Sequence, residues 1–344
     1  MKKKIFITGG CGYIGGILIR KLLADGFKVA CFDLLIYGDS SVKSLSNNKD
    51  FELIKGDIRD KKKLQEAIKG SDAIVHLAAI VGDKPCDAAL NASYDINFNG
   101  TKILAEIAEK QKIGKFIFAS TCSNYGISNP NEFAKETSSL NPVSLYAESK
   151  IDCEEFLRNF SSEKLKVVSL RFGTAYGMSY RTRFDLTVNS FAYEAFKTNK
   201  ISVFAHDTWR PYIHVQDICN IIIEFLKMEK LKENSYTFNA GYTDENYTKK
   251  QVVEKLIKIL PDLKVEYISL SNDKRNYKVD FTKIENFLKN KRTKDVNYGF
   301  REILNALKAK NINDKDFYNN NLEALVKFFK VNQKKLERKF TYEK

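Results

Sequence analysis

The sequence has no long hydrophobic run. No stretch of its 344 residues approaches the roughly 18 uninterrupted apolar residues that a transmembrane helix requires, so we expect no membrane span. Prolines number only 5, and neither a low-complexity linker nor an internal repeat divides the chain, which argues against a string of independent modules. The 6 cysteines are scattered, with no CxxC pair and no histidine close enough to complete a metal cluster. We therefore predict reduced thiols and no bound metal.

Basic residues outnumber acidic ones, and the formal net charge is +14. Such a charge could attract nucleic acid, a membrane surface or an anionic small molecule. The lysines are spread through every segment with acids between them, as in residues 61–66 and 249–258, and no basic stripe is interleaved with the aromatics on which single strands stack. We expect solvated helix faces and no nucleic-acid partner, and we interpret the basic run 334–339 as a solvated tail.

The N-terminus has the pattern of a strand. Residues 1–4 lead directly into the short apolar run 5–7, and glycines follow in place of the long apolar region and cleavage site of a signal peptide. We therefore expect the chain to stay in the cytoplasm.

Apolar runs of strand length alternate with helical patterns over the first half of the chain. Continuous apolar strands separated by amphipathic helices predict a parallel sheet that helices cover on both faces. The predicted fold class is α/β, a Rossmann-type doubly wound parallel sheet. The expected strands are residues 5–8, 29–33, 73–78, 116–120 and 167–172, and the expected helices between them are 18–23, 64–68 and 103–108.

After about Gly177 the alternation becomes less regular. A chain of this length suits a nucleotide-binding unit with a smaller partner domain. We therefore predict a Rossmann domain over residues 1–177 and a smaller, mixed α/β C-terminal substrate lobe over residues 178–344, and we expect the two to interleave. In the second lobe we expect helices near residues 186–197, 217–227 and 249–259 and a strand near 201–204.

A glycine-rich turn, TGGCGYIG over residues 8–15, follows the first predicted strand and opens a helix. Glycines in this context let the backbone approach a pyrophosphate, whose charge then lies at the helix N-terminus. Asp33 ends the second strand, where a carboxylate accepts hydrogen bonds from the adenosine ribose hydroxyls and repels a 2′-phosphate, so NAD is favoured over NADP. The alternative is a glycine turn that merely packs the helix on the strand.

Two weaker stretches point to the same coenzyme. Gly56, Asp57 and Ile58 could place a carboxylate by the adenine, and residues 76–79 (HLAA) offer small side chains where the backbone could pass close to the coenzyme. His76 itself also fits a core histidine with satisfied hydrogen bonds. The residues that we predict to contact NAD are Gly9, Gly12, Tyr13, Ile14, Gly15, Asp33, Asp57, Ile58, Leu77, Ala78 and Ala79.

Tyr146 and Lys150 are spaced i, i+4, which places both side chains on one face of a helix. A lone YxxxK is common, and its alternative interpretation is a surface tyrosine beside a solvated lysine. Here STCSNYG (120–126) follows a strand at the carboxyl edge of the sheet, where a crevice forms, so Thr121 can bond a substrate hydroxyl beside Tyr146. We predict a proton transfer to a Tyr146 phenolate coupled to a hydride transfer, with the Lys150 ammonium and the positive nicotinamide ring together lowering the pKa of the phenol.

Taken together, these motifs resemble the extended short-chain dehydrogenase/reductase family, in its NAD-dependent nucleotide-sugar epimerase/dehydratase branch. By this resemblance Thr121, Tyr146 and Lys150 form the catalytic triad, Asn97 has a structural role, and Lys84 lies near the nicotinamide. The resemblance covers residues 4 to about 288, and the matching pieces are TGGCGYIG (8–15), GDIRD (56–60), HLAA (76–79), NFNGT (97–101), STCSNYG (120–126), YAESK (146–150), LRFGTAYG (170–177) and RPYIHVQD (210–217).

The resemblance also implies a nucleotide-diphosphate sugar as the substrate. In the family the arginine that opens RPYIHV grips the substrate diphosphate, which carries over to Arg210, and Arg275 would be a second clamp. Arginine suits this task better than lysine because its planar fork binds phosphate oxygens in pairs. Arg181 and Arg183 either reach the phosphates or the sugar or belong to a solvated loop. The predicted substrate contacts are Cys122, Ser123, Thr174, Arg181, Arg183, Asn189, Arg210 and Arg275.

Two departures from the family pattern narrow the range of reactions that we expect. Family members that eliminate water carry an Asp-Glu pair after the catalytic threonine, whereas Cys122 and Ser123 follow Thr121 here, so a 4,6-dehydratase is disfavoured. Thr174 replaces the family's usual asparagine, which argues against a standard UDP-galactose 4-epimerase pocket.

The stretch 178–191 is similar to enzymes that oxidise C4 of a nucleotide-linked sugar or heptose for surface-polysaccharide synthesis. We therefore expect an NAD-dependent oxidoreductase that acts at C4 through a 4-keto species. A 4-epimerase is the alternative within enzymes, and a non-catalytic dinucleotide sensor is the alternative from another class. Family members pair through two helices, so we also expect a homodimer formed by residues 100–112 and 145–160.

Overall fold

The structure is a computed structural model, and it describes residues 2–129, 131–268, 274–289, 291–309 and 322–329. The basic run 334–339, which we interpreted as a solvated tail, lies outside these residues. Within them, no helix combines the length and the apolar character needed to cross a membrane. All six cysteines are buried free thiols, as predicted.

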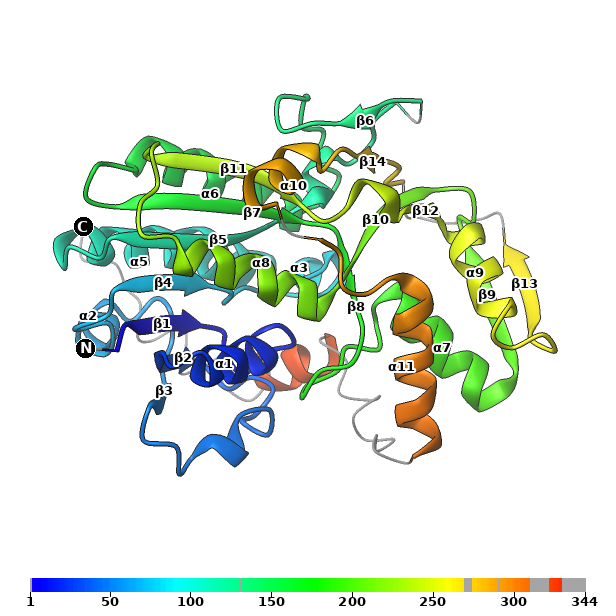
Figure 1. Cartoon of the computed structure of the whole chain (residues 1–344), viewed down its shortest axis with the longest axis horizontal. Coiled ribbons are helices and arrows are strands. Elements are labelled where there is room, and N and C mark those ends of the chain that lie inside the picture. The colour runs from blue at the N-terminus through cyan, green and yellow to red at the C-terminus, as the bar shows by residue number, and fades with distance from the viewer. Residues whose placement is uncertain (1, 130, 269–273, 290, 310–321, 330–344) are drawn as a thin grey trace.

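A seven-stranded parallel sheet forms the centre of the molecule (Figure 1), which confirms the predicted fold class. The inner strands are short apolar runs, and parallel neighbours are joined by helices, as a doubly wound fold requires. The strand order is β11-β7-β5-β4-β1-β2-β3. The bounds are β1 Lys4–Thr8, β2 Lys28–Asp33, β3 Phe51–Lys55, β4 Ala73–His76, β5 Lys115–Thr121, β7 Lys166–Phe172 and β11 Ser235–Ala240.

Alternate residues of the strands enter two separate cores because successive side chains point to opposite faces of a sheet. In β1, Ile5 and Ile7 pack with α1 (Gly15–Ala24) and α8 (Val215–Lys227), while Phe6 belongs to the core on the other face. That second core contains α2 (Lys61–Ala67), α5 (Gly100–Lys110) and α6 (Leu145–Phe160). Both faces of the sheet are therefore covered by helices.

The loop between β4 and α5 is built from short helical pieces. These are α3 (Asp83–Ala88), α4 (Leu90–Tyr94) and the π-helical turn η2 (Asp95–Asn99). All three contact α6, so the region around the predicted catalytic helix is compact.

A smaller lobe lies beyond the carboxyl ends of the strands, at the right of Figure 1. Its core is a third cluster of buried side chains, which the helices α7 (Thr187–Thr198), α9 (Lys249–Ile257) and α11 (Val296–Lys308) share with small sheets. These small sheets are β8 (Thr174–Tyr176) with β10 (Trp209–His214) and β12 (Asn246–Thr248), and β9 (Lys200–Phe204) with β13 (Lys264–Ile268). A further pair, β6 (Phe133–Ala134) with β14 (Lys278–Val279), packs into the core of the large sheet instead.

The chain passes between the two lobes more than once. After β10 it returns to the large sheet, where α8 packs against α1 and β11 pairs with β7 along its whole length. Helix α10 (Thr282–Leu288) then packs on β11. Residues 215–240 lie within the range that we assigned to the substrate lobe, but their apolar faces complete the core of the large sheet. The lobes interleave in this way because a parallel edge strand needs a crossover helix before it.

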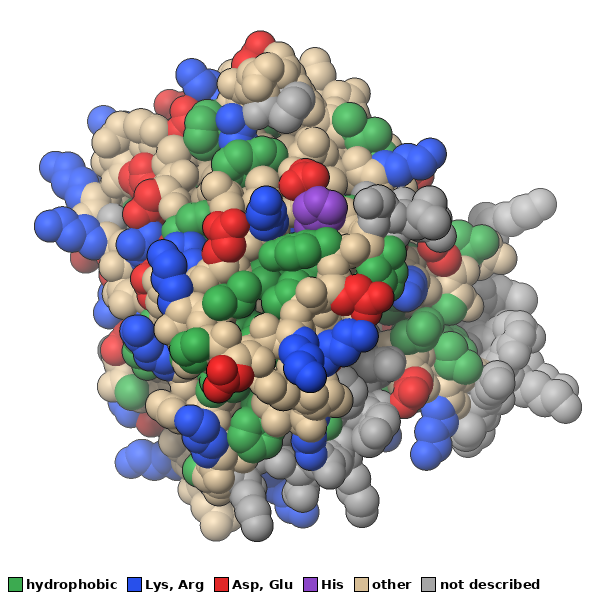
Figure 2. Space-filling model, turned by 90° about the vertical axis from the view of Figure 1, so that its right-hand side faces the viewer, with side chains coloured by type: hydrophobic (Ala, Val, Ile, Leu, Met, Phe, Trp, Pro, Cys, Tyr) green, Lys and Arg blue, Asp and Glu red, His purple; other side chains and the backbone are tan. Residues whose placement is uncertain are grey.

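The face of the smaller lobe in Figure 2 carries lysine and arginine side chains with acidic side chains among them. Basic groups on this view do not merge into one continuous stripe. That distribution agrees with the interpretation of the lysines as solvated surface groups.

Candidate active site

A cavity of about 1400 Å³ lies at the carboxyl edge of the large sheet, between the lobes. The strand order reverses between β4 and β1, and open parallel sheets bind ligands at such switch points. Of the predicted site residues, the cavity is lined by Gly9, Gly12, Tyr13, Ile14, Gly15, Asp33, Asp57, Ile58, Leu77, Ala78, Ala79, Lys84, Thr121, Ser123, Tyr146, Lys150, Thr174, Arg181, Arg183, Arg210 and Arg275.

The glycine-rich turn connects β1 to α1 and passes close to the end of β4. Gly9 has a φ of 70°, and a Cβ there would lie 2.6 Å from the backbone nitrogen of Ala78. A Cβ at Gly15 would overlap the backbone of Gly10. Only glycine fits at these two positions, and the turn opens directly into the N-terminus of α1. The arrangement fits a coenzyme diphosphate, whose charge an exposed helix N-terminus stabilises.

Asp33 holds the end of β2 against this turn. Its Oδ2 accepts a hydrogen bond from the backbone N–H of Cys11 (2.9 Å), and its Oδ1 accepts one from Leu35 (2.8 Å). Burial raises the pKa of the Asp33 carboxyl, and these two hydrogen bonds together with the charge of Arg181 oppose that rise. Asp33 therefore stands at the sheet position where a coenzyme ribose is expected.

Asp57 reaches the cavity but is already paired. The guanidinium of Arg59 lies 2.8 Å from a carboxylate oxygen of Asp57 and 2.8 Å from one of Asp95. Through Arg59, the Asp57 carboxylate connects the loop after β3 to η2. The same residue also lines the cavity.

Thr121, Tyr146 and Lys150 meet where β5 ends against α6. Ser144 caps α6 by accepting a hydrogen bond from the N–H of Ala147, so Tyr146 and Lys150 lie in the first turns of the helix. The Lys150 ammonium donates to the carbonyl oxygen of Ala119 (2.9 Å) and lies 6.0 Å from the centre of the Tyr146 ring. The structure brings the three predicted catalytic residues to one place on the cavity wall.

The protein groups around Tyr146 do not by themselves lower its pKa; our expectation also includes the positive nicotinamide ring, which only a bound coenzyme supplies. Burial raises that pKa above its ordinary value, and the nearby Cys86 adds to the rise; Arg183 and a hydrogen bond with Thr121 act in the opposite direction. Burial also lowers the pKa of Lys150. The cost of removing the phenolate from water exceeds the stabilisation that the surrounding protein charges provide.

Asn97 joins two segments behind the catalytic helix. Its side chain accepts a hydrogen bond from the N–H of Ile80 (2.8 Å) and donates one to the carbonyl oxygen of Ile80 (3.0 Å). The Asn97 amide also donates to Ser149 Oγ (3.4 Å) on α6. These contacts are of the structural kind that the sequence predicts for Asn97.

His76 is a core residue. Its Nδ1 lies 2.6 Å from Thr8 Oγ1 and its Nε2 lies 2.8 Å from Thr101 Oγ1, and the side chain is buried. Burial lowers the pKa of His76 to about 3, so the ring stays neutral. The core interpretation of His76 is confirmed.

Arg210 approaches the cavity from β10, and Arg275 from the residues that precede β14. Arg210 is buried, donates to the carbonyl oxygens of Trp209 and Arg275, and lies 5.2 Å from the centre of the Tyr277 ring. The Arg275 guanidinium lies 3.2 Å from a carboxylate oxygen of Asp83. The protein therefore holds two arginines in the wall of the cavity.

Arg181 and Arg183 also line the cavity, so they are not part of a fully solvated loop. Arg181 stacks on the ring of Tyr37, with 3.8 Å from the guanidinium carbon to the ring centre. Arg183 makes two hydrogen bonds to the Asp185 carboxylate, at 3.1 and 2.6 Å. Arg181 thus lies by Tyr37, and its charge acts on Asp33.

Two predicted substrate contacts are placed elsewhere. Cys122 is buried, and its Sγ donates to the carbonyl oxygen of Arg171 (3.1 Å), because the residue after Thr121 turns back into the core. Asn189 is buried in α7, where its side chain bonds the backbone of Gly177 and Arg183. Neither is among the described residues that line the cavity. The prediction of substrate contact for these two side chains does not agree with the structure.

Sequence reasoning missed several residues of the cavity wall. Tyr37 follows Asp33 in a loop without regular periodicity, and Asp83 begins a short helix. Tyr277 approaches from a strand end far along the chain, and its hydroxyl lies 3.4 Å from Ser123 Oγ. Among these residues, only Asp185 could have been found from the sequence, because it stands two residues from Arg183. The missed lining residues include Tyr37, Asp83, Asp185, Leu186, Tyr277 and Leu322.

Known proteins share this sequence pattern and architecture. A family model described as the NAD dependent epimerase/dehydratase family matches residues 5–241. A UDP-glucose 4-epimerase of Rhizobium meliloti (strain 1021) is 30% identical over 277 residues, which span 74% of this chain and 81% of that relative. Among solved structures, the Thermus thermophilus UDP-glucose 4-epimerase in complex with NAD is 25% identical, with a TM-score of 0.75 over 89% of this chain and 99% of that one. The fold of a Bacillus anthracis dTDP-glucose 4,6-dehydratase in complex with NAD is also similar, with a TM-score of 0.80, 24% identity and coverage of 91% of this chain and 99% of that one.

Proposed function

The chain belongs to the NAD dependent epimerase/dehydratase family, and on that premise we propose that it is an enzyme that uses NAD to oxidise C4 of a nucleotide sugar. The observation that carries the proposal is the meeting of Thr121, Tyr146 and Lys150 in one cavity. The glycine-rich turn and the arginines Arg210 and Arg275 line the same cavity. A dinucleotide and a diphosphate sugar can therefore both approach the same phenol.

The part of the cavity that the glycine-rich turn and Asp33 line fits NAD. The glycines allow the backbone to approach a diphosphate, and Asp33 ends β2 where the ribose hydroxyls need acceptors. When bound, NAD supplies a hydride acceptor and a positively charged ring. That positive charge would favour the Tyr146 phenolate, whose formation the buried protein surroundings disfavour.

In the proposed reaction Tyr146 removes the proton of the sugar hydroxyl while the hydride leaves C4. Thr121 orients the phenol through its hydrogen bond, and Lys150 is fixed by Ala119 on the same side of the ring. Arg210 and Arg275 would bind the substrate diphosphate, since a guanidinium fork matches paired phosphate oxygens. The sugar would then lie between these arginines and Tyr146.

A 4-epimerase is the net reaction that we favour. The side chain of Cys122 points into the core, and Ser123 has no carboxylate, so these two positions provide no acid and base for the loss of water. Return of the same hydride to the opposite face of the 4-keto sugar needs no second substrate. The relative that is 30% identical over most of both chains is a UDP-glucose 4-epimerase, which supports this choice over a net dehydrogenase.

The first experiment compares the wild type with Tyr146→Phe on a panel of UDP-, dTDP-, GDP- and CDP-linked sugars with NAD. Loss of the phenol should lower kcat by about 10²–10⁴-fold, the usual contribution of a positioned acid or base. Tyr267→Phe is the matched control, because Tyr267 is exposed on β13 outside the cavity. Reduced nicotinamide is followed by absorbance and the sugars by chromatography.

A new sugar isomer without net NADH would support the epimerase. Net NADH with a 4-keto product would establish a dehydrogenase and overturn the favoured net reaction. If Tyr146→Phe turned over sugar as fast as Tyr267→Phe, Tyr146 would not be the base.

A further inference from the structure

The segment between β8 and α7 crosses the coenzyme side of the cavity and is tied to the glycine-rich turn. Tyr13, in the turn, donates its hydroxyl to the carbonyl oxygen of Gly177 (2.7 Å), and Ser179 Oγ donates to the carbonyl oxygen of Tyr13 (2.5 Å). One residue of the turn is thus bound at two points by the smaller lobe. The segment, residues 177–187, cannot move away without breaking both bonds.

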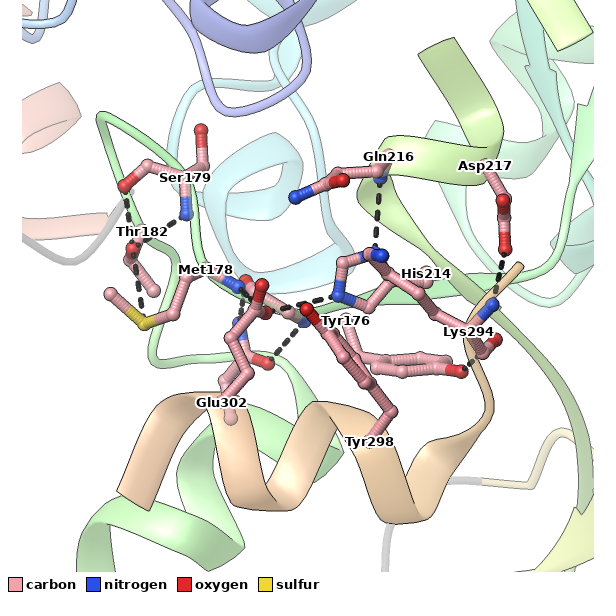
Figure 3. Close-up of polar contacts among 12 residues, drawn as sticks. Tyr176, Met178, Ser179, Thr182, His214, Gln216, Asp217, Lys294, Tyr298 and Glu302 are labelled. Carbon is pink, nitrogen blue, oxygen red and sulfur yellow. Dashed lines mark hydrogen bonds and ion pairs between the residues drawn. The ribbon is translucent and has the colours of Figure 1, made fainter. Parts of the chain in front are cut away.

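The start of the segment is anchored in the smaller lobe (Figure 3). The backbone N–H of Met178 donates to Glu302 Oε2 (2.7 Å), and the same oxygen lies 3.0 Å from His214 Nε2. Thr182 and Ser179 then close a tight turn through a pair of hydrogen bonds. Helix α11 therefore holds the segment at its root.

The far side of the segment is fixed from α7. The Asn189 amide accepts a hydrogen bond from the N–H of Gly177 (2.9 Å) and donates one to the carbonyl oxygen of Arg183 (2.9 Å). Asn189 is fully buried, so these bonds are shielded from water. These bonds explain why Asn189, which we predicted to contact the substrate, contacts the backbone of this segment instead.

Two aromatic contacts extend from the segment over the first lobe. Tyr180 is exposed, and its ring lies 3.4 Å from the guanidinium carbon of Arg20 on α1, outside the cavity. Arg181 points inward and stacks on Tyr37, and both line the cavity with Asp33. The guanidinium of Arg181 therefore stands at the end of the cavity where the coenzyme ribose is expected.

We propose that residues 177–187 form a clasp over the adenosine half of the coenzyme and that Arg181 is the coenzyme-contacting residue of this clasp. A planar guanidinium can stack on an adenine ring and donate hydrogen bonds to ribose or phosphate oxygens. The inference rests on the proposed function, because it takes NAD to be the coenzyme. It adds a coenzyme contact from the smaller lobe, on residues that the glycine-rich motif does not include.

The clasp has a chemical consequence. Release of the coenzyme requires the segment to lift from Tyr13, Arg20 and Tyr37 together, so exchange with free NAD is slow. Slow exchange suits a reaction in which the hydride taken from C4 returns to C4 and the proton held by Tyr146 returns to the sugar oxygen. Electrons and protons then balance within one bound complex, and no external oxidant is consumed.

The test measures coenzyme binding with no sugar present. NAD affinity is measured by titration calorimetry, and NADH release by stopped-flow fluorescence after a chase with excess NAD. Arg181→Ala should release NADH roughly ten to a hundred times faster than the wild type, as expected from the loss of a charge-assisted hydrogen bond. Arg301→Ala is the matched control, since Arg301 is exposed on α11 outside the cavity, and it should match the wild type.

A second variant separates the clasp from the direct contact. Tyr180→Ala removes the anchor on Arg20 but leaves Arg181 in place, so release and association should both accelerate while the Kd changes less than the release rate. Wild-type rates in Arg181→Ala would overturn the proposal. If Arg181→Ala did not fold, wild-type release from Arg181→Lys, which keeps the charge without the planar fork, would overturn it instead. A chain that binds NAD through Arg181 but oxidises no nucleotide sugar would contradict the proposed function and leave the clasp standing.

Discussion

At Gly9 the backbone of the glycine-rich turn passes against the end of β4, with no room for a side chain. Gly9→Ala would push its Cβ against the backbone of Ala78, and its φ of 70° would be strained as well. We expect NAD affinity to fall by roughly tenfold or more, because a displacement of the turn moves the N–H groups that approach the diphosphate. Titration calorimetry with NAD measures this change.

Gly26→Ala is the control for the effect of φ alone. Gly26 has a φ of 84°, yet a Cβ there would meet nothing within 4 Å. The substitution should cost about 1 kcal/mol of folding free energy and leave NAD affinity unchanged. Equal NAD affinity in the two variants would show that the approach of Gly9 to Ala78 does not matter for binding.

Residues that belong to a motif were predictable from the sequence, and residues placed by tertiary contacts were not. The glycine turn, Asp33 and the Tyr146/Lys150 pair were found because their spacing along one strand end or one helix face determines where they lie. Tyr37 was missed, because it reaches the cavity only through its stacking with a side chain from the other lobe. Cys122 and Asn189 were misplaced for a related reason, since position next to a motif does not fix the direction of a side chain.

At the scale of single elements, α6 carries the proposed base and is held to β7 by a buried ion pair. Arg171 makes a bond of 2.6 Å to Glu154, and both side chains are less than a tenth exposed. Glu154→Gln would leave the Arg171 charge buried without its counterion, so the free energy of unfolding should fall by about 3 kcal/mol. Urea denaturation followed by circular dichroism measures this change.

Glu155→Gln provides the comparison on the same helix. Glu155 is exposed, so its substitution should change the free energy of unfolding by no more than about 0.5 kcal/mol. If Glu154→Gln were as stable as Glu155→Gln, the buried pair would not be what anchors α6.

The sequence predicted the central strands and their helices but not the edges of the sheet. The predicted strands at residues 5–8, 29–33, 116–120 and 167–172 match β1, β2, β5 and β7, because buried parallel strands are continuous apolar runs. β3 and β11 were missed. β3 has the sequence FELIK with partly exposed side chains, and β11 has SYTFNA, so neither shows the apolar run of a strand buried on both faces.

At the scale of the whole molecule, aromatic side chains collect beside α6. Phe156 stacks on Phe160 with 5.2 Å between ring centres, Phe98 lies 6.3 Å from Phe156, and Tyr94 is partly exposed. We propose that this surface, with α5, joins two copies of the chain, as the family resemblance implies. Partly exposed aromatic groups that cluster in this way mark interfaces more often than free surface.

Light scattering at micromolar concentration tests the proposed dimer. The wild type should have the mass of two chains, and Phe156→Glu should shift it to one, because a carboxylate would be buried without a partner. Phe204→Glu is the control, since Phe204 is exposed on β9 in the other lobe, and it should remain dimeric. A wild type with the mass of one chain would contradict the proposal.

Because the chain returns late to the large sheet, this sheet stays incomplete during part of the synthesis of the protein. β7 is complete at Phe172, but its partner β11 begins only at Ser235, after a large part of the smaller lobe. Ribosomes add about 5–20 residues per second, so a nascent chain would present an unpaired strand edge for several seconds. Such an edge is a template for pairing with other chains, and a fragment that ended at Gly177 would keep it permanently. The large sheet of this enzyme therefore gains its last strand only after much of the smaller lobe has been made.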